Sequence, residues 1–182
     1  KKILHSYIME GMVEHQEDET ANTTQTSLLD QWTLWAHLPH DTNWNLESYK
    51  QIGTIKTIEE ALTLFENLPD IMVKNCMLFL MRKGIQPIWE DEKNRNGGCF
   101  SYKINNRTVP SCWKNLSYVL LGETLTSPEL SKYLTGITIS PKKNFCILKI
   151  WLSTCAYNNP EIISEIEGLP RHGCLFKKHI ND

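Results

Sequence analysis

The stretch from Gly84 to Phe100, G-I-Q-P-I-W-E-D-E-K-N-R-N-G-G-C-F, most constrains what this chain can fold into. Gly84 and Pro87 interrupt any helix or central strand, so we expect Trp89 to lie on a loop. A large aromatic ring beside an acid on a loop suits a planar ligand with N–H donors and positive charge. The ring offers a face for stacking, and Glu90 can accept two parallel hydrogen bonds. The alternative is a tryptophan that closes the end of a sheet beside a solvated acidic turn.

The hydrophobic pattern on either side of this loop predicts both strands and helices. Alternating or continuous apolar residues predict strands at 28–38, 49–56, 76–81, 99–104, 133–140, 145–154 and 173–178. Helical periodicity predicts three helices, at 57–68, 110–121 and 159–166. A capping box of Thr57 and Glu60 opens the first of them. Hairpin connections without regular βαβ alternation favour an α+β fold, in which a largely antiparallel sheet keeps its helices on one face.

Composition divides the chain into a polar tail and one folded domain. Residues 1–27 carry two lysines and five acids, a net charge of −3, which leaves a charge near +1 on residues 28–182. Such a tail cannot bury enough surface to offset its ordering entropy, so we expect it to be mostly disordered, although Tyr7–Val13 could fold against a partner. A nearly neutral domain does not coat polyanions, so any contact with nucleic acid must be local.

The remaining composition disfavours several classes of protein. There is no run of about 18 apolar residues to span a membrane, and the first residues have no apolar stretch long enough for a secretory signal. The six cysteines form no C-x-x-C pair and lie mostly in apolar segments, which predicts free thiols in a reducing compartment. We therefore expect a cytoplasmic monomer without metal, cofactor or membrane contact.

Six tryptophans in one domain, two of them in polar loops, form the most specific pattern. The motifs are W-x-x-W at Trp32 and Trp35, Trp44 after Asn43, P-I-W-E-D-E-K-N-x-x-G-G, L-L-G-E at 120–123 and I-W at 150–151. In order and spacing they resemble the eukaryotic translation initiation factor 4E family, the mRNA cap-binding proteins, over roughly residues 28–178. The resemblance implies a curved antiparallel sheet backed by three α-helices on its convex face, with the cap site in the concave face.

The resemblance assigns four residues to the 7-methylguanine base of the cap. Two loop tryptophans of the family enclose the base, and the matching positions are Trp44 and Trp89. Methylation at N7 makes the base cationic, so stacking between indoles gains a cation–π contribution. Glu90 matches the acid that accepts the base N1–H and N2–H, and Trp151 matches the residue that covers the N7-methyl group. The alternative for Trp151 is a core position in a central strand.

Phosphate recognition is where the chain departs from the family. Lys142 matches an arginine that holds the cap triphosphate, but Asn144 and Ile147 stand where two lysines are expected. Cys99 replaces an arginine that usually follows the Gly-Gly pair. Four nearby residues are candidates to substitute: Lys143, Lys177, Lys178 and His179. Each of these candidates is also an ordinary solvated surface charge.

The resemblance also assigns a protein partner to the convex face, where a scaffold factor of the 4G type and inhibitors of the family dock through a Tyr-x4-Leu-hydrophobic helix. Here Thr26-Ser27-Leu28 replaces a His-Pro-Leu segment, Leu62 replaces an exposed tryptophan, and Lys114 and Tyr118 replace leucines. Ile58, Leu62 and Tyr118 could form a different apolar patch for a dedicated partner. This divergence favours a distant paralogue or a viral homologue, which would work in the host cytoplasm.

These features predict a translation initiation factor that binds the mRNA 5′ cap and recruits capped mRNA through a 4G-type scaffold or a divergent partner. The alternative is a non-enzymatic interaction module or translational repressor with weak or altered cap binding. We do not expect an enzyme, because no local motif joins His37, His40, Cys99 and Cys112 into a nucleophile and base.

Overall fold

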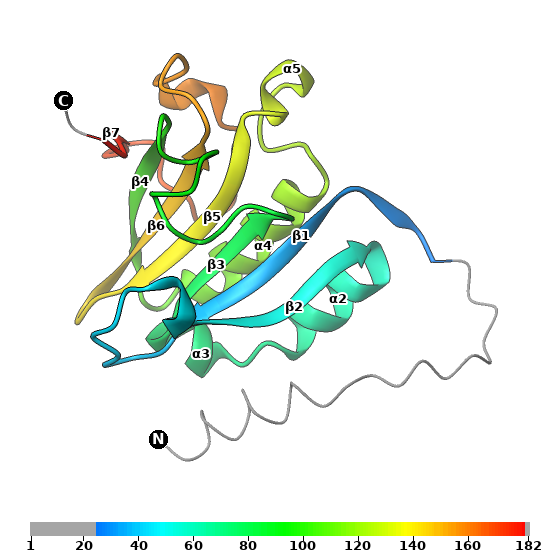
Figure 1. Ribbon diagram of the computed structural model, residues 1–182, viewed down its shortest axis with the longest axis vertical. Coiled ribbons are helices and arrows are strands. Elements are labelled where there is room, and N and C mark those ends of the chain that lie inside the picture. Colours follow the sequence, from blue (N-terminus) through cyan, green and yellow to red (C-terminus); the bar gives the residue numbers. More distant parts are fainter. Residues whose placement is uncertain (1–24, 181–182) are drawn as a thin grey trace.

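The computed structural model of the protein describes residues 25–180. Segments with alternating or continuous apolar residues form one curved antiparallel sheet (Figure 1). Its strands are β1 Ser27–His37, β2 Tyr49–Thr57, β3 Met77–Arg82, β4 Gly98–Asn105, β5 Leu134–Pro141, β6 Phe145–Leu152 and β7 Leu175–Lys178. They lie in the order β2-β1-β3-β5-β6-β4-β7. Every neighbouring pair in this order is antiparallel.

Three α-helices pack against one face of the sheet (Figure 1). They are α2 Ile58–Asn67, α3 Asp70–Asn75 and α4 Val109–Leu121. A short helix, α5 Pro128–Ser131, and two 3-10 turns, η1 Leu46–Ser48 and η2 Pro160–Ile162, lie in connections. The capping box of Thr57 and Glu60 is present at the start of α2, as predicted. The predicted α+β fold, with three helices behind a curved antiparallel sheet, is confirmed.

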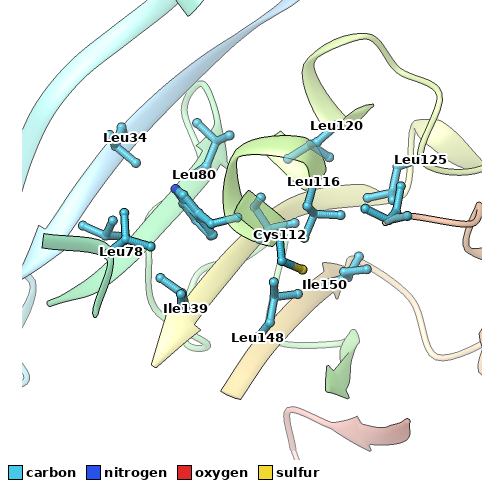
Figure 2. Packing of buried hydrophobic residues seen from close by; sticks show 14 of the residues in the cluster. Leu34, Leu78, Leu80, Cys112, Leu116, Leu120, Leu125, Ile139, Leu148 and Ile150 are labelled. Atoms are coloured by element: carbon cyan, nitrogen blue, oxygen red, sulfur yellow. The ribbon is translucent and has the colours of Figure 1, made fainter. Parts of the chain in front are cut away.

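Side chains alternate across each strand, so the sheet packs an apolar cluster on each face. The larger cluster lies under the helices. Figure 2 shows labelled side chains of α4, β3, β5 and β6 in this cluster: Cys112, Leu116, Leu120, Leu78, Leu80, Ile139, Leu148 and Ile150. The smaller cluster lies on the opposite face and contains Phe79, Met81, Cys99 and Trp151. In β1, Trp32 and Leu34 belong to the larger cluster, whereas Trp35 packs against the smaller one.

The helix predicted at 159–166 is wrong, and the third helix of the domain is α3 instead. After η2 the backbone amide of Ser164 donates to the carbonyl of Leu125, at 2.9 Å, rather than to a carbonyl one turn earlier. The Ser164 hydroxyl also bonds the carbonyl of Thr124, at 2.8 Å. These bonds to a distant segment satisfy the backbone that a helix would have used.

The boundary between tail and domain was predicted at residue 27. Residues 1–24 of the predicted tail lie outside the described residues, and Ser27 already belongs to β1, where it pairs with Thr57. No helix between residues 25 and 180 is both long enough and apolar enough to cross a membrane. All six cysteines are free thiols, and four of them are buried.

The Gly-Gly pair permits a close approach at the start of β4. A Cβ atom on Gly97 would lie 1.7 Å from the carbonyl oxygen of Leu152, and one on Gly98 would lie 2.5 Å from the ring of Phe176. Both distances are shorter than any real contact, so only glycine lets β4 enter between β6 and β7 here. The same pair therefore fixes the end of the loop that carries Trp89.

A half-buried arginine joins three segments that are far apart in sequence. Arg82, at the end of β3, forms an ion pair with Asp30 of β1 and a two-bond pair with Glu123, at 2.9 and 3.1 Å. Its Nε donates to the carbonyl of Leu134, at 3.1 Å, and its guanidinium lies 4.4 Å from the ring centre of Trp32. Burial by itself lowers the pKa of Arg82, but the hydrogen bonds to Glu123 and Asp30 and the charges of these carboxylates together raise it above its usual value.

We expect Arg82→Met to destabilise the fold by roughly 3–5 kcal/mol, because it leaves the nearly buried Glu123 carboxylate without its partner. Chemical denaturation of the full chain measures this change. Arg171→Met is the matched control, since it breaks the exposed Arg171–Glu165 pair and should cost less than about 1 kcal/mol. Equal losses in the two variants would contradict a structural role for Arg82.

Candidate ligand-binding site

Two polar side chains build the loop that carries Trp89. The carboxylate of Asp91 accepts from the backbone amides of Gln86 and Lys93, at 2.9 and 2.8 Å. Asn94, fully buried, donates to the carbonyls of Gln86 and Ile88, at 3.1 and 2.8 Å. With its backbone fixed from inside, the loop presents Trp89 with 49% of its surface exposed. Within the W-E-D-E-K-N stretch, the Asp and Asn are therefore structural.

The loop that carries Trp44 is fixed in a similar way. Asp41 accepts from the amide of Asn43, and Asn43 accepts from the amide of Asn45, both at 2.9 Å. The ring of His37, at the end of β1, stacks on Trp44 with centroids 4.2 Å apart and planes 1° apart. His37 Nε2 lies 2.7 Å from the carbonyl oxygen of Asn43, as a donor. One face of Trp44 is thus backed by an imidazole, while the indole remains 55% exposed.

Glu90 lies near the aromatic group that supports Trp44. Tyr49 meets His37 edge-on at 5.1 Å and Phe79 at 5.2 Å between ring centres. Burial, and then the negative charge of Glu90, raise the pKa of Tyr49. Glu90 is exposed and forms no ion pair with any residue between 25 and 180, so its carboxylate is free to accept from a ligand. Trp44 and Trp89 make no ring contact with each other in the described part of the chain.

Trp151 lies on the face opposite α4, where His179 covers it. It is 6% exposed and packs with Phe79, Met81 and Cys99 in the smaller apolar cluster. The rings of Trp151 and His179 are 4.7 Å apart. His179 Nδ1 donates to the carbonyl of Asn94, at 2.6 Å, which ties the segment after β7 to the Trp89 loop. Trp151 is therefore both a packed residue and a neighbour of the loop that carries Trp89 and Glu90.

Two lysines stand close to Trp151 on the same face. In β6, Lys149 is two residues from Trp151 and therefore points the same way. In β7, Lys177 is directly opposite Cys99, which is itself opposite Trp151. Burial raises the pKa of the Cys99 thiol, whereas the positive charges of Lys149 and Lys177 lower it. The cationic groups that meet near Trp151 are thus Lys149 and Lys177.

The predicted phosphate ligands fall into two groups. Lys142 and Lys143 lie exposed at the β5–β6 hairpin, eight or nine residues from Trp151, roughly 25–30 Å along the strand. Lys177 and His179 lie beside Trp151, and Lys178 is exposed on β7. The sequence reasoning missed Lys149. Alternation along β6 is the signal that could have found it, since Lys149 and Trp151 share a face.

The predicted partner surface lies on α2 and α4. Ile58 and Leu62 are exposed on α2, and Leu28 is partly buried beside the core. Lys114 pairs with Glu66 of α2 at 2.5 Å, and the Tyr118 hydroxyl donates to the same carboxylate at 3.4 Å. The two substituted positions on α4 therefore face α2 and are joined to it.

Comparison with known proteins identifies similar sequences and one similar group of structures. The profile described as eukaryotic initiation factor 4E matches residues 27–178. A translation initiation factor 4E homolog of Acanthamoeba polyphaga mimivirus is 32% identical over 140 residues, which cover 64% of this chain and 51% of the homolog. Initiation factor 4E-1 of Schizosaccharomyces pombe is 30% identical over 158 residues, covering 82% and 67%. The chain thus spans about half the viral relative and two thirds of the yeast relative.

Among solved structures, a Schistosome eIF4E complexed with m7GpppG and 4E-BP matches with a TM-score of 0.66. The two are 23% identical, and the match covers 72% of this chain and 74% of that one. At this level of identity the likeness concerns the fold, which is the same curved sheet with helices on one face.

Burial lowers the pKa of His179, and the charge of Lys149 lowers it further, against the opposing hydrogen bond to Asn94. The folded protein therefore takes up this proton less readily than the unfolded chain, so the contribution of His179 to stability falls as pH drops through about 6.5. We expect Lys149→Met to raise the pKa of His179 in an NMR titration, whereas Lys142→Met leaves it unchanged. The same value in both variants would show that Lys149 does not face this ring.

Proposed function

Because the chain belongs to the eukaryotic initiation factor 4E family, we propose that it binds the 7-methylguanosine cap of mRNA and serves translation initiation through a protein partner. The observation that carries the proposal is a pair of exposed indoles, Trp44 and Trp89, on two loops held by internal hydrogen bonds. Exposing two tryptophans on fixed loops leaves apolar surface uncovered, which a stacking ligand would bury.

In this proposal the methylated base stacks between Trp44 and Trp89. The His37 ring covers one face of Trp44, so the base takes the other face. Fixed loops favour binding because little side-chain and backbone freedom is lost when the base enters. The cationic base adds a cation–π contribution that unmethylated guanine lacks.

Glu90 is the proposed acceptor for the N1–H and N2–H groups of the base. The carboxylate of the neighbouring Asp91 already accepts hydrogen bonds from two backbone amides of the loop, whereas Glu90 has no ion pair within the described residues. A carboxylate that accepts both donors in one plane selects guanine over bases that present a different donor pattern. Trp151 supports this end of the site, where we propose that it contacts the N7-methyl group.

We propose that Lys149 and Lys177 hold the cap phosphates. Both lysines lie near Cys99, where the resemblance to the family implies an arginine. Their side chains would supply the positive charge that this arginine would otherwise provide. His179, Lys178, Lys142 and Lys143 stay as predicted ligands of a longer phosphate chain.

The proposal extends to the context of the protein. Residues 28–182 would form the cap-binding domain behind a tail of residues 1–27, working in the cytoplasm, or the host cytoplasm for a viral protein. Recruitment would use a scaffold of the 4G type or a dedicated partner on the α2–α4 surface, without catalysis. The altered surface favours a second candidate function, a repressor or interaction module with weak cap binding.

We expect 7-methyl-GTP to quench the intrinsic fluorescence and to bind much more tightly than GTP. Trp44→Ala or Trp89→Ala should each weaken binding by about 1–3 kcal/mol, the scale of one base–aromatic stack. Fluorescence titration of the full chain measures both effects, with calorimetry for the tryptophan variants. Equal affinity for the methylated and unmethylated nucleotides would contradict the proposed function.

Glu90 and Glu92 offer a matched pair of variants. Glu90→Gln should cost roughly 1.5–3 kcal/mol of 7-methyl-GTP affinity, because it replaces a charge-assisted acceptor by an amide. Glu92 is exposed on the same loop, and we expect Glu92→Gln to change little. Similar losses in the two variants would reject the assignment of Glu90.

The phosphate assignment predicts that Lys149→Ala removes most of the gain in affinity from 7-methyl-GMP to 7-methyl-GTP. Lys142→Ala, on the distant part of the hairpin, should remove less of it. Affinity should also respond only weakly to salt, since few cations are involved. A steep salt dependence that survives Lys149→Ala would place the phosphates elsewhere.

A further inference from the structure

The exposed tryptophan Trp44 is backed by a ring that can take up a proton. His37, the last residue of β1, is 2% exposed, and its imidazole lies parallel to the indole of Trp44, with centroids 4.2 Å and planes 1° apart. A histidine changes its charge close to neutral pH, unlike the other aromatic side chains. The group that supports this indole therefore has two charge states.

Contacts with the β1–β2 connection hold the ring in both charge states. The Nε2–H group of His37 donates to the carbonyl of Asn43, directly before Trp44, at 2.7 Å. A second proton would enter at Nδ1 and leave this bond intact, because both nitrogens of an imidazolium are donors. The acids of the connection, Asp41 and Glu47, both accept from Asn43. Protonation of His37 therefore changes the charge behind the indole without removing its support.

The strands around His37 do not neutralise such a charge. In the sheet His37 lies opposite Tyr49 of β2 and Met77 of β3, and Tyr49 meets it edge-on at 5.1 Å between ring centres. Burial, and then the charge of Glu90, raise the pKa of Tyr49, so its phenol stays neutral wherever histidine titrates. Between residues 25 and 180 His37 forms no ion pair. A positive charge on this ring would thus lie unpaired behind Trp44.

A charge on His37 acts on the other face of Trp44, which is the face left for a ligand. An indole attracts cations at both faces, and a cation held at one face weakens the attraction at the other. A base stacked on the free face would lie roughly 8 Å from the imidazole, two ring spacings of about 4 Å. At that distance two positive charges lower affinity roughly two- to thirty-fold, for effective dielectric constants of about 80 to 20. 7-Methylguanine carries a positive charge and guanine does not, so only the methylated base is repelled.

We propose that His37 is a positioning residue through which pH controls the selection of the methylated base. Neutral His37 holds Trp44 for the cationic base, whereas protonated His37 repels that base and narrows its preference over guanine. The preference for 7-methyl-GTP over GTP therefore falls as pH falls, because the charged ring predominates on the acidic side. This inference rests on the proposed function, since it concerns the ligand that stacks on Trp44.

Fluorescence titration of the full chain with 7-methyl-GTP and with GTP, from about pH 7.5 to about pH 5.5, tests the proposal. We expect the ratio of the two affinities to fall roughly two- to thirty-fold over this range in the unmodified protein. The triphosphates titrate alike in both nucleotides, so their effect cancels in the ratio. His37→Phe keeps a stacked ring that cannot be protonated, and its ratio should not fall.

Two further variants separate charge from support. His37→Gln keeps a donor for the Asn43 carbonyl but has no ring and no charge. It should bind both nucleotides more weakly, with a ratio that does not fall with pH. His40→Asn is the matched control, because it removes an exposed histidine from the same connection, where a φ of 68° also suits asparagine. It should keep the pH dependence of the unmodified protein.

An NMR titration of the unliganded protein follows His37 without any nucleotide. We expect its ring signals to report protonation between about pH 8 and about pH 5, and the indole signals of Trp44 to shift with them. A ring that stays neutral over this range, or an equal fall of the ratio in His37→Phe, would overturn the proposal. A ratio above one that is constant with pH would overturn it and leave cap binding standing, whereas a ratio near one at every pH would contradict the proposed function as well.

Discussion

In β6, Leu148 and Ile150 point toward α4, while Lys149 and Trp151 point to the opposite face. This alternation, imposed by the pleat of every strand, is the constraint on which the rest of the molecule depends. It lets one sheet be covered by helices on one side and carry a polar-rimmed aromatic surface on the other. A slip of one residue in β6 would exchange the two sets, removing the lysine from the site and placing its charge in the core.

Two loops held by internal hydrogen bonds position the exposed tryptophans beside the sheet. Within the W-E-D-E-K-N stretch, Asp91 and Asn94 form hydrogen bonds to the loop backbone, whereas Trp89 and Glu90 are exposed to solvent. His179, which directly follows β7, adds a hydrogen bond to the same loop. Loops fixed in this way lose little freedom when a ligand binds, which is the physical basis for placing the proposed base site there.

The two faces of the sheet can change separately, because their side chains do not share a cluster. On the helix side, Glu66 joins α2 to α4 through Lys114 and Tyr118. At positions where the resemblance to the family implies leucines, these two residues form a polar link between the helices. The exposed apolar side chains on these helices are Ile58 and Leu62 of α2 and Ile71 of α3. The side chains on the helix side can therefore differ without disturbing the exposed tryptophans on the opposite face.

The sequence by itself determined the strands, two of the three main helices, the family, and Trp44, Trp89 and Glu90 as candidates, because these depend on local pattern and on motifs with fixed spacing. It did not determine α3, the loss of a helix at 159–166, or the backing of Trp44 by His37. Those features depend on hydrogen bonds and stacking between segments that are far apart in the chain. Lys149 could have been found from the sequence, because alternation along the strand predicted at 145–154 places it on the same face as Trp151. Tertiary structure alone decided which charges gather there, because strand pairing sets which residues of β4, β6 and β7 become neighbours.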